Sequence, residues 1–181
     1  MSFTPPARNH DRQGAPASAY LIAFVCYGSW LPGQTGAVDR DHSLFGSRWP
    51  EADAAQETHA MNRMKQDTYI LDANRRQVVL KALQEVCSQR AWVLLAAHVR
   101  SNHVHTVVAS DNSPEHVMSA FKSYASRALN RLALDRPDRR RWARHGSTRY
   151  LWISPMISAA IRYVICEQGA PMAVFEMPAA R

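Results

Sequence analysis

Two histidines, His103 and His105, stand one residue apart in a stretch rich in valine. Residues i and i+2 of a β-strand project from the same face, so both imidazoles should point together while Val104 and Thr106 point the other way. Two neutral imidazoles at this spacing can bind one divalent metal ion. Asn102 can orient one ring, as metal-bound histidines usually require. A hydrogen-bonded surface pair is the alternative, because a metal site needs at least one further ligand.

The last predicted helix offers candidates for that ligand and for a nucleophile. Tyr163 and Glu167 are i and i+4, hence neighbours on one helix face, and Gln168 follows one position later. Tyr163 is offset from the apolar stripe of this helix, so the core does not require it. A lone helical tyrosine is usually a packing residue, and only a metal ligand one turn away makes this one a candidate nucleophile. Tyr124 is the rival; it lies in an earlier helix beside Phe121, where packing or contact with a substrate backbone is favoured.

The elements that must position these residues follow from periodicity and capping signals. Strands are predicted over 19–26, 92–98 and 103–109, and helices over 73–90, 114–132 and 154–168. Asp72 and Ser113 are expected N-caps, and Gly169 is the expected stop of the last helix. The second and third strands should form a hairpin around Arg100-Ser101-Asn102. The order predicts an α+β, ferredoxin-like sandwich: an antiparallel sheet with helices on one face, plus a C-terminal helix carrying the tyrosine.

Bulk properties predict one domain over 18–176, after a polar, proline-bearing leader over 1–17 that we expect to be disordered. Residues 34–65 are polar and contain several glycines and prolines, which predicts an irregular insertion or a functional flap. No apolar run approaches the roughly 20 residues needed to cross a bilayer. Three distant cysteines argue against a disulfide framework and against a cysteine zinc site. A cytoplasmic protein is expected.

Positive charge is concentrated in one part of the chain. A net charge of +7 and a pI near 9.8 indicate a polyanionic partner, although basic proteins without one are common. Residues 122–149 hold nine positive and two negative side chains, a surplus equal to the net charge of the whole chain. Guanidinium groups suit phosphate oxygens, and the interleaved Trp142 and Tyr150 suit unpaired bases; a solvated charged face is the alternative. The candidate DNA-binding residues are Lys122, Arg127, Arg131, Arg139, Arg140, Arg141, Arg144 and Arg149.

The sequence resembles the single-tyrosine transposases in four segments: SNHVHTVV, FKSYASRALN, RRRWARHGSTRYLW and AAIRYVICEQGAPMAVF. These are the IS200-like and REP-associated tyrosine transposases of the HUH (His–hydrophobic–His) nuclease superfamily. The early segment YGSWLPGQTGAVD resembles the REP-associated branch, and the resemblance spans about residues 18–176. It implies that His103 and His105 bind the metal and that Tyr163 is the nucleophile. The family usually has Gln or Asn four residues after the tyrosine, so helical geometry favours Glu167 as third ligand and residue identity favours Gln168.

The chemistry that this resemblance implies is cleavage and rejoining of single-stranded DNA. A Mg²⁺ or Mn²⁺ ion would polarise the scissile phosphate. Tyr163 would attack phosphorus, giving a 5′-phosphotyrosine and a free 3′-hydroxyl that can later reseal the strand without ATP. The implied partners are single-stranded or hairpin DNA and a second copy of the chain, since related enzymes often assemble the active site across a homodimer. The protein would be nucleoid-associated when bound to DNA.

Two alternative functions compete with this one. A histidine-triad nucleotide hydrolase needs three histidines at alternate strand positions, whereas Ser101 and Val107 stand at the flanking ones. A domesticated relative that binds repeated DNA hairpins without cutting them is the stronger alternative, and it predicts an intact basic segment with a broken metal site. Because His103, His105 and Tyr163 are all present, the sequence favours an active enzyme.

Overall fold

The computed structural model describes residues 18–34 and 52–178. Its elements are β1 (Ala19–Cys26), α1 (Ala54–Asn62), α2 (Ala73–Gln89), β2 (Val93–Val99), β3 (His103–Ala109), α3 (Pro114–Arg131), β4 (Trp142–Leu151), α4 (Ser154–Cys166) and β5 (Ala173–Glu176). The chain divides into two compact units, one of residues 1–16 and 30–65 and the other of residues 17–29 and 66–181. The predicted leader and residues 35–51 of the predicted insertion lie outside the described residues.

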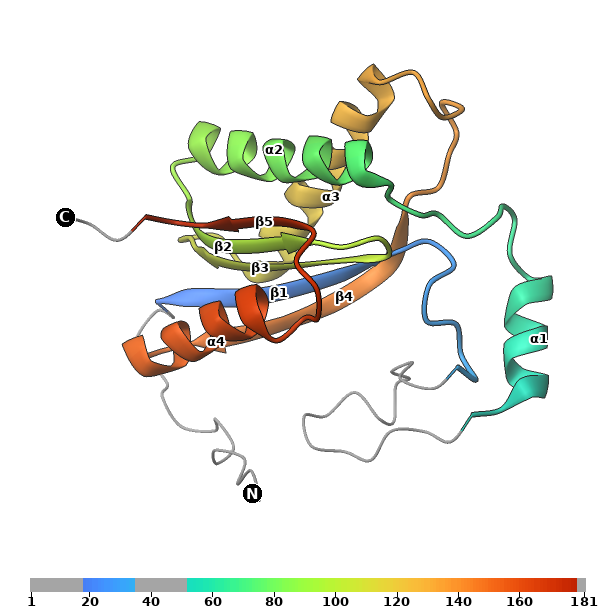
Figure 1. Cartoon of the computed structure of the whole chain (residues 1–181), viewed down its shortest axis with the longest axis horizontal. Coiled ribbons are helices and arrows are strands. Elements are labelled where there is room, and N and C mark those ends of the chain that lie inside the picture. Colours follow the sequence, from blue (N-terminus) through green and yellow to red (C-terminus); the bar gives the residue numbers. More distant parts are fainter. Residues whose placement is uncertain (1–17, 35–51, 179–181) are drawn as a thin grey trace. The chain divides into compact units, whose positions relative to one another are not determined.

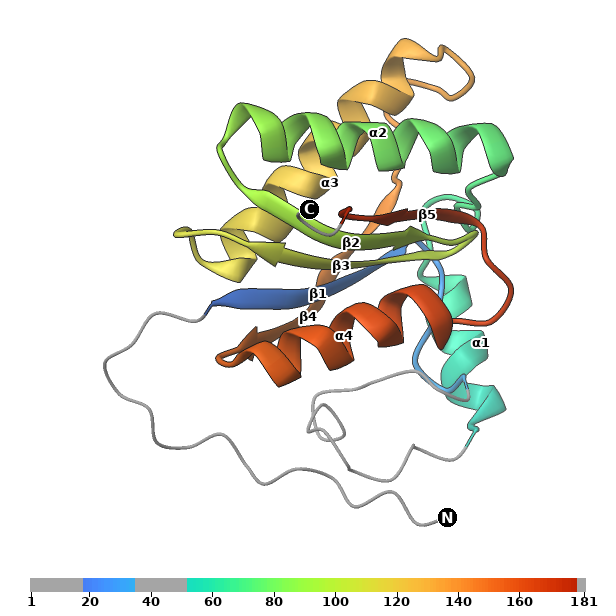
Figure 2. The same cartoon turned by 60° about the vertical axis from the view of Figure 1, so that its left-hand side comes forward.

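The larger unit is built on a five-stranded antiparallel sheet with strand order β4-β1-β3-β2-β5. The succession β1-α2-β2-β3-α3-β4 with this order is the ferredoxin-like βαββαβ arrangement, to which β5 adds an edge strand beside β2. Helices α2 and α3 lie on one side of the sheet and α4 on the other (Figure 1, Figure 2). The predicted α+β fold is confirmed, and the helix that carries Tyr163 covers the second face.

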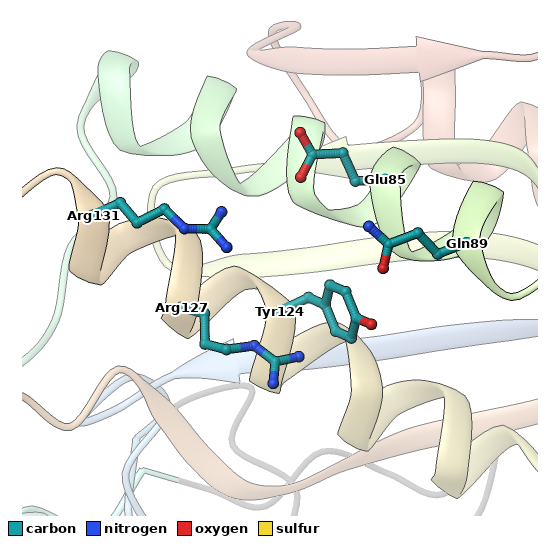
Figure 3. Close-up of a pocket in the computed structure, with 5 residues that line it drawn as sticks. All are labelled: Glu85, Gln89, Tyr124, Arg127 and Arg131. Atoms are coloured by element: carbon teal, nitrogen blue, oxygen red, sulfur yellow. The ribbon is translucent and has the colours of Figure 1, made fainter.

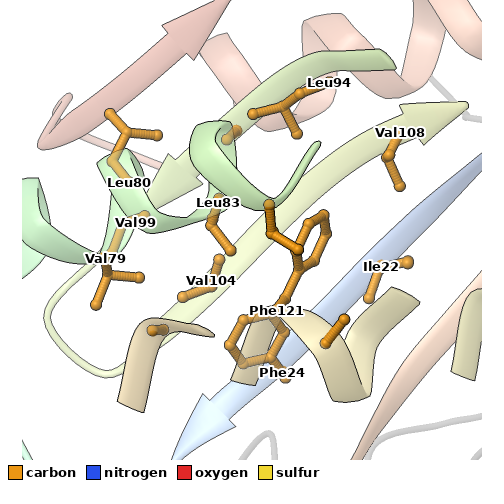
Figure 4. Close-up of a cluster of buried hydrophobic side chains, with 14 of the residues drawn as sticks. Ile22, Phe24, Val79, Leu80, Leu83, Leu94, Val99, Val104, Val108 and Phe121 are labelled. Carbon is orange, nitrogen blue, oxygen red and sulfur yellow. The ribbon is translucent and has the colours of Figure 1, made fainter. Parts of the chain in front are cut away.

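Alternation along the strands builds a separate core on each face of the sheet. The main core lies under α2 and α3, where Ile22 and Phe24 of β1 pack with Phe121 of α3 (Figure 4). A smaller cluster lies under α4 and includes Val107 and Val164. Successive side chains of an inner strand therefore alternate between the main core and the cluster under α4.

Two helices begin where capping chemistry predicts. The Asp72 side chain accepts a hydrogen bond from the Arg75 backbone N–H at 2.8 Å, ahead of α2. The Ser113 side chain accepts one from His116 N–H at 3.3 Å, and Pro114 is the first residue of α3. Both caps satisfy amide groups that the first helical turn leaves without a partner, so these helix starts are confirmed.

Strand β4 lies at the end of the arginine-rich segment, where no strand was predicted from the sequence. It pairs with β1 at the edge of the sheet, and most of its side chains are exposed. An edge strand tolerates charged side chains, which also protect it from pairing with other chains, so its sequence lacks the apolar alternation of an inner strand. Gly146 permits the close pairing, since a Cβ there would lie 2.4 Å from the carbonyl oxygen of Ala23 and 2.5 Å from Met118 Sδ.

The smaller unit contains α1, although residues 34–65 were expected to be irregular. The Asp53 side chain caps this helix by accepting from Ala55 N–H at 2.9 Å and Gln56 N–H at 3.0 Å. Gln34 Nε2 donates to Glu57 Oε1 at 2.8 Å within the same unit. Because α1 buries none of its residues, its sequence carries no apolar stripe that would have indicated a helix.

Cys26, Cys87 and Cys166 are free thiols in the structure. Among the described helices, none has both the length and the apolar character needed to cross a membrane.

A cluster of ionic groups around Asp135 joins the segment before α2 to the one before β4. Tyr69 donates its hydroxyl proton to Asp135 Oδ2 at 2.6 Å, and Arg75 and Arg141 lie 2.9 and 3.2 Å from the carboxylate oxygens. Burial alone would raise the pKa of Asp135, but these hydrogen bonds and the two positive charges outweigh burial and lower it. The carboxylate thus holds together parts of the chain that are distant in sequence.

We expect Asp135→Asn to lower the free energy of unfolding at pH 7 by roughly 3 kcal/mol, because it leaves the buried Arg141 guanidinium without its counterion. A lowered carboxyl pKa contributes stability that is complete above the pKa of the unfolded chain, about 3.9, and is lost as pH falls through the folded value. The difference between wild type and variant should therefore shrink below about pH 4. Urea unfolding at several pH values measures it, and a difference that stays constant down to pH 3 would contradict this account.

Candidate active site

His103 and His105 project from β3 toward α4, while Val104 and Thr106 are fully buried on the other face. The two imidazole centroids lie 4.9 Å apart. Asn102 Oδ1 lies 2.7 Å from His103 Nδ1, which therefore donates, so that the lone pair of this ring is on Nε2.

Burial keeps both imidazoles neutral at physiological pH. It is the largest influence on each ring, assisted by the charge of Arg100 at His103 and of His103 at His105, and the pKa falls to about 4 for His103 and about 3 for His105. His105 Nδ1 is buried and has no hydrogen bond of normal geometry to any residue that the structure describes. Neutral rings with buried lone pairs suit metal coordination better than they suit a hydrogen-bonded surface pair.

Tyr163 lies on α4 above this pair. Its ring centroid is 5.7 Å from that of His105, and 38% of the residue is exposed. The neighbouring Val164 is fully buried and anchors the helix on the sheet, which turns Tyr163 away from the core and toward the histidines. The tyrosine and the histidine pair thus meet within one chain.

His98 of β2 fixes the end of α4 that carries Tyr163. It is fully buried beside His105 in the sheet register, on the same face. Its Nε2 accepts from the Met172 backbone N–H at 3.2 Å, so Nδ1 carries the proton and donates to the carbonyl oxygen of Val164 at 3.1 Å. Sequence reasoning missed this residue, although a histidine in an apolar strand next to the metal-binding motif was a usable signal.

Glu167 and Gln168 take different directions at the end of α4. The helix ends at Cys166, and the Glu167 carboxylate lies 3.4 Å from Arg162 Nε, with both side chains largely exposed. The half-buried Gln168 folds back: its Nε2 donates to the carbonyl oxygen of Tyr163 at 3.4 Å, and its side chain acts on the pKa of both histidines. Of the two candidate third ligands, Gln168 is the one beside the imidazoles.

The donor set fits a divalent metal ion. The Gln168 side chain lies within reach of the two neutral imidazoles, and its amide oxygen is a ligand type that Mg²⁺ and Mn²⁺ accept. Within the described ranges no three His, Cys, Asp or Glu side chains gather as a metal site.

Tyr124 lies on the opposite face of the sheet, in α3. Together with Glu85 and Gln89 of α2 and Arg127 and Arg131 of α3 it lines a shallow cavity of about 260 Å³ (Figure 3). The Arg127 guanidinium stacks over its ring at 4.3 Å. Because α3 and α4 cover opposite faces of the sheet, Tyr124 is separated from the histidine pair by the sheet itself.

The candidate DNA-binding residues divide into exposed and internally bonded groups. Lys122 Nζ donates to the carbonyl oxygens of Ala143 and His145 at 2.9 and 3.0 Å, so it fastens β4 rather than facing solvent. Arg141 is only 4% exposed and paired with Asp135, which leaves it unavailable to a phosphate, contrary to expectation. Arg139 Nη2 is bonded to two backbone carbonyls. The exposed members are Arg127, Arg131, Arg140, Arg144 and Arg149.

The sequence and the fold were compared with those of known proteins. The family model described as "Transposase IS200 like" matches residues 54–154, more than half of the chain, including the histidine pair and ending before Tyr163. The fold is similar to a REP-associated tyrosine transposase solved in complex with a REP hairpin, with a TM-score of 0.50 and 10% identity over 89% of this chain and 72% of that one. A candidate transposase from Deinococcus radiodurans R1 gives a TM-score of 0.42 at 14% identity, over 90% and 99% of the chains. No curated protein sequence matches the chain.

Proposed function

The chain belongs to the IS200-like transposase family, and on that premise we propose that it nicks and rejoins single-stranded DNA through a covalent 5′-phosphotyrosine at Tyr163. One observation carries the proposal: the Tyr163 ring lies 5.7 Å from His105, at the helix end whose Gln168 reaches both histidines. A nucleophile beside a set of metal ligands is the arrangement that a phosphoryl transfer of this kind needs.

His103, His105 and Gln168 would hold the metal ion, with Asn102 fixing the orientation of the first ring. When bound, a Mg²⁺ or Mn²⁺ ion supplies polarisation of the phosphate oxygens. The Tyr163 hydroxyl oxygen bonds to phosphorus and gives up its proton; the bond from phosphorus to the 3′-oxygen breaks, and this oxygen takes a proton. The reverse reaction, with a 3′-hydroxyl as nucleophile, restores the phosphodiester and frees the tyrosine.

We propose that the exposed arginines hold the DNA backbone by charge-assisted contacts. Arg149 stands opposite Leu21 in the register of β4 with β1, and Leu21 packs against the core beneath α4, so Arg149 is on the face of the histidine pair. Arg127 and Arg131 lie beside the cavity on the other face. A hairpin large enough to reach both faces is a suitable substrate.

The test uses a hairpin-bearing oligonucleotide labelled at either end, incubated with the full chain and Mg²⁺ or Mn²⁺. A 5′-phosphotyrosine predicts that the protein adduct carries the 3′ label and that the released fragment carries the 5′ label and a free 3′-hydroxyl. An adduct bearing the 5′ label would overturn the polarity. Tight binding without any adduct under both metals would instead support a domesticated DNA-binding protein.

A further inference from the structure

Arg100 is the only Asp, Glu, Lys or Arg between Ala91 and Ser110. It lies in the turn of the β2–β3 hairpin, where its backbone N–H donates to the carbonyl oxygen of His103 at 2.8 Å. The positive charge of Arg100 thus stands alone in this stretch, three residues before His103.

The guanidinium of Arg100 is held through Nη1, whereas its Nε and Nη2 donate to no residue that the structure describes. Its Nη1 donates to the carbonyl oxygen of Ala170 at 3.0 Å and lies 3.5 Å from Nε2 of the buried His98. Among the residues that the structure describes, no carboxylate pairs with Arg100. Gly169, with φ of +79°, turns the chain beside it, and a Cβ at that position would lie 3.5 Å from Nη2. Because residue 169 is glycine, no side chain of this residue lies against the Arg100 guanidinium.

Arg100 lies close to the metal-binding pair. Its backbone N–H is bonded to the His103 carbonyl oxygen, and its Nη1 lies 3.5 Å from Nε2 of His98, which stands beside His105 in the sheet register. A fixed cation beside ligands for a second cation disfavours metal binding. Within the described part of the chain no carboxylate pairs with Arg100 to offset this, and Glu167 pairs with Arg162. An anion that binds between the two cations would remove the conflict.

We infer that Arg100 is a phosphate-binding residue of the active site, whose open guanidinium edge receives the phosphodiester that Tyr163 attacks. This rests on the proposed function and adds a contact that the metal ligands and the nucleophile do not provide. The planar fork donates two N–H groups to the non-bridging oxygens and stabilises the negative charge that develops on them during transfer. The Ala170 carbonyl oxygen fixes the fork in advance, so less side-chain freedom is lost when the phosphate binds.

The test compares Arg100→Met and Arg100→Lys in full-length protein that also carries Tyr163→Phe, so that no adduct forms. Mn²⁺ binding is measured without DNA, and binding of a random-sequence single-stranded oligonucleotide pool is measured without metal. Removing the charge should tighten Mn²⁺ binding roughly fivefold, since the repulsion is gone. It should weaken DNA binding on the order of tenfold, since a charge-assisted contact is lost. Arg100→Lys should leave Mn²⁺ affinity unchanged and weaken DNA binding less.

Arg90→Met is the matched control, because it removes the same charge from a side chain that stacks on Trp92 and contacts His116, away from the histidine pair. It should change neither constant. If Arg100→Met weakens Mn²⁺ binding, Arg100 is only a clamp for the Gln168–Ala170 segment and the inference is wrong; unchanged DNA affinity would also overturn it. If wild type binds no Mn²⁺ but Arg100→Met still loses DNA affinity, the phosphate contact stands and the metal-dependent function fails.

Discussion

Replacing Tyr163 with phenylalanine is expected to abolish the covalent protein–DNA adduct and to reduce metal-dependent cleavage by a factor of at least about 10³. The substitution removes only the hydroxyl that attacks phosphorus and keeps the ring beside His105. Because the residue is 38% exposed and its hydroxyl has no hydrogen bond to any residue that the structure describes, the fold should persist. A denaturing gel with a 3′-labelled oligonucleotide measures the adduct, and the melting temperature checks the fold.

Tyr124→Phe is the matched control for this substitution. It removes the same hydroxyl from the cavity on the opposite face of the sheet, where Arg127 stacks on the ring. We expect the adduct to form at the wild-type level in this variant. If the adduct survived Tyr163→Phe and disappeared in Tyr124→Phe, the assignment of the nucleophile would be reversed.

Mixing two inactive variants separates a site within one chain from a site shared by a homodimer. We propose the former, because Tyr163 and His105 of the same chain are already in ring contact. A mixture of Tyr163→Phe and His105→Asn should then remain inactive. Recovery of cleavage on mixing would mean that one subunit's tyrosine serves the histidines of another, and it would support the dimeric arrangement that the sequence resemblance implies.

Local rules of the chain predicted the elements of the larger unit that bury a clear apolar face. The Asp72 and Ser113 caps mark the starts of α2 and α3 because side-chain oxygens there satisfy backbone amides of the first turn. The alternation of His103 and His105 with buried residues predicted correctly that both imidazoles share a face. These features depend on neighbours within a few residues, which a sequence shows directly.

Features that depend on distant partners could not be predicted in this way. Strand β4 is polar because only β1 pairs with it, and its partner lies more than a hundred residues earlier in the chain. Arg141 and Lys122 looked like solvent-exposed charges, but Asp135 neutralises the first and backbone carbonyls of β4 hold the second. Charge alone does not reveal whether a side chain faces water or a buried partner.

The choice between Glu167 and Gln168 as third metal ligand could not be made from the sequence either. In a continuing helix Glu167 would project near Tyr163, whereas Gln168 would be turned away by roughly 140°. The helix ends at Cys166, however, and Gln168 instead folds back to the carbonyl oxygen of Tyr163. Because α4 ends at Cys166, helical spacing does not apply to Glu167, the residue that it was used to favour.

We expect Gln168→Ala to weaken Mn²⁺ binding and metal-dependent cleavage by roughly 100-fold, because it removes the amide oxygen beside both imidazoles. Gln168→Glu should retain binding, since a carboxylate also supplies an oxygen ligand that Mn²⁺ prefers. Glu167→Ala is the matched control one position earlier: its carboxylate is exposed and paired with Arg162, so both constants should change by no more than about twofold. Titration of Mn²⁺ and single-turnover cleavage measure the two effects. A large loss in Glu167→Ala with little change in Gln168→Ala would assign the ligand to Glu167 and would require the end of α4 to rearrange when the metal binds.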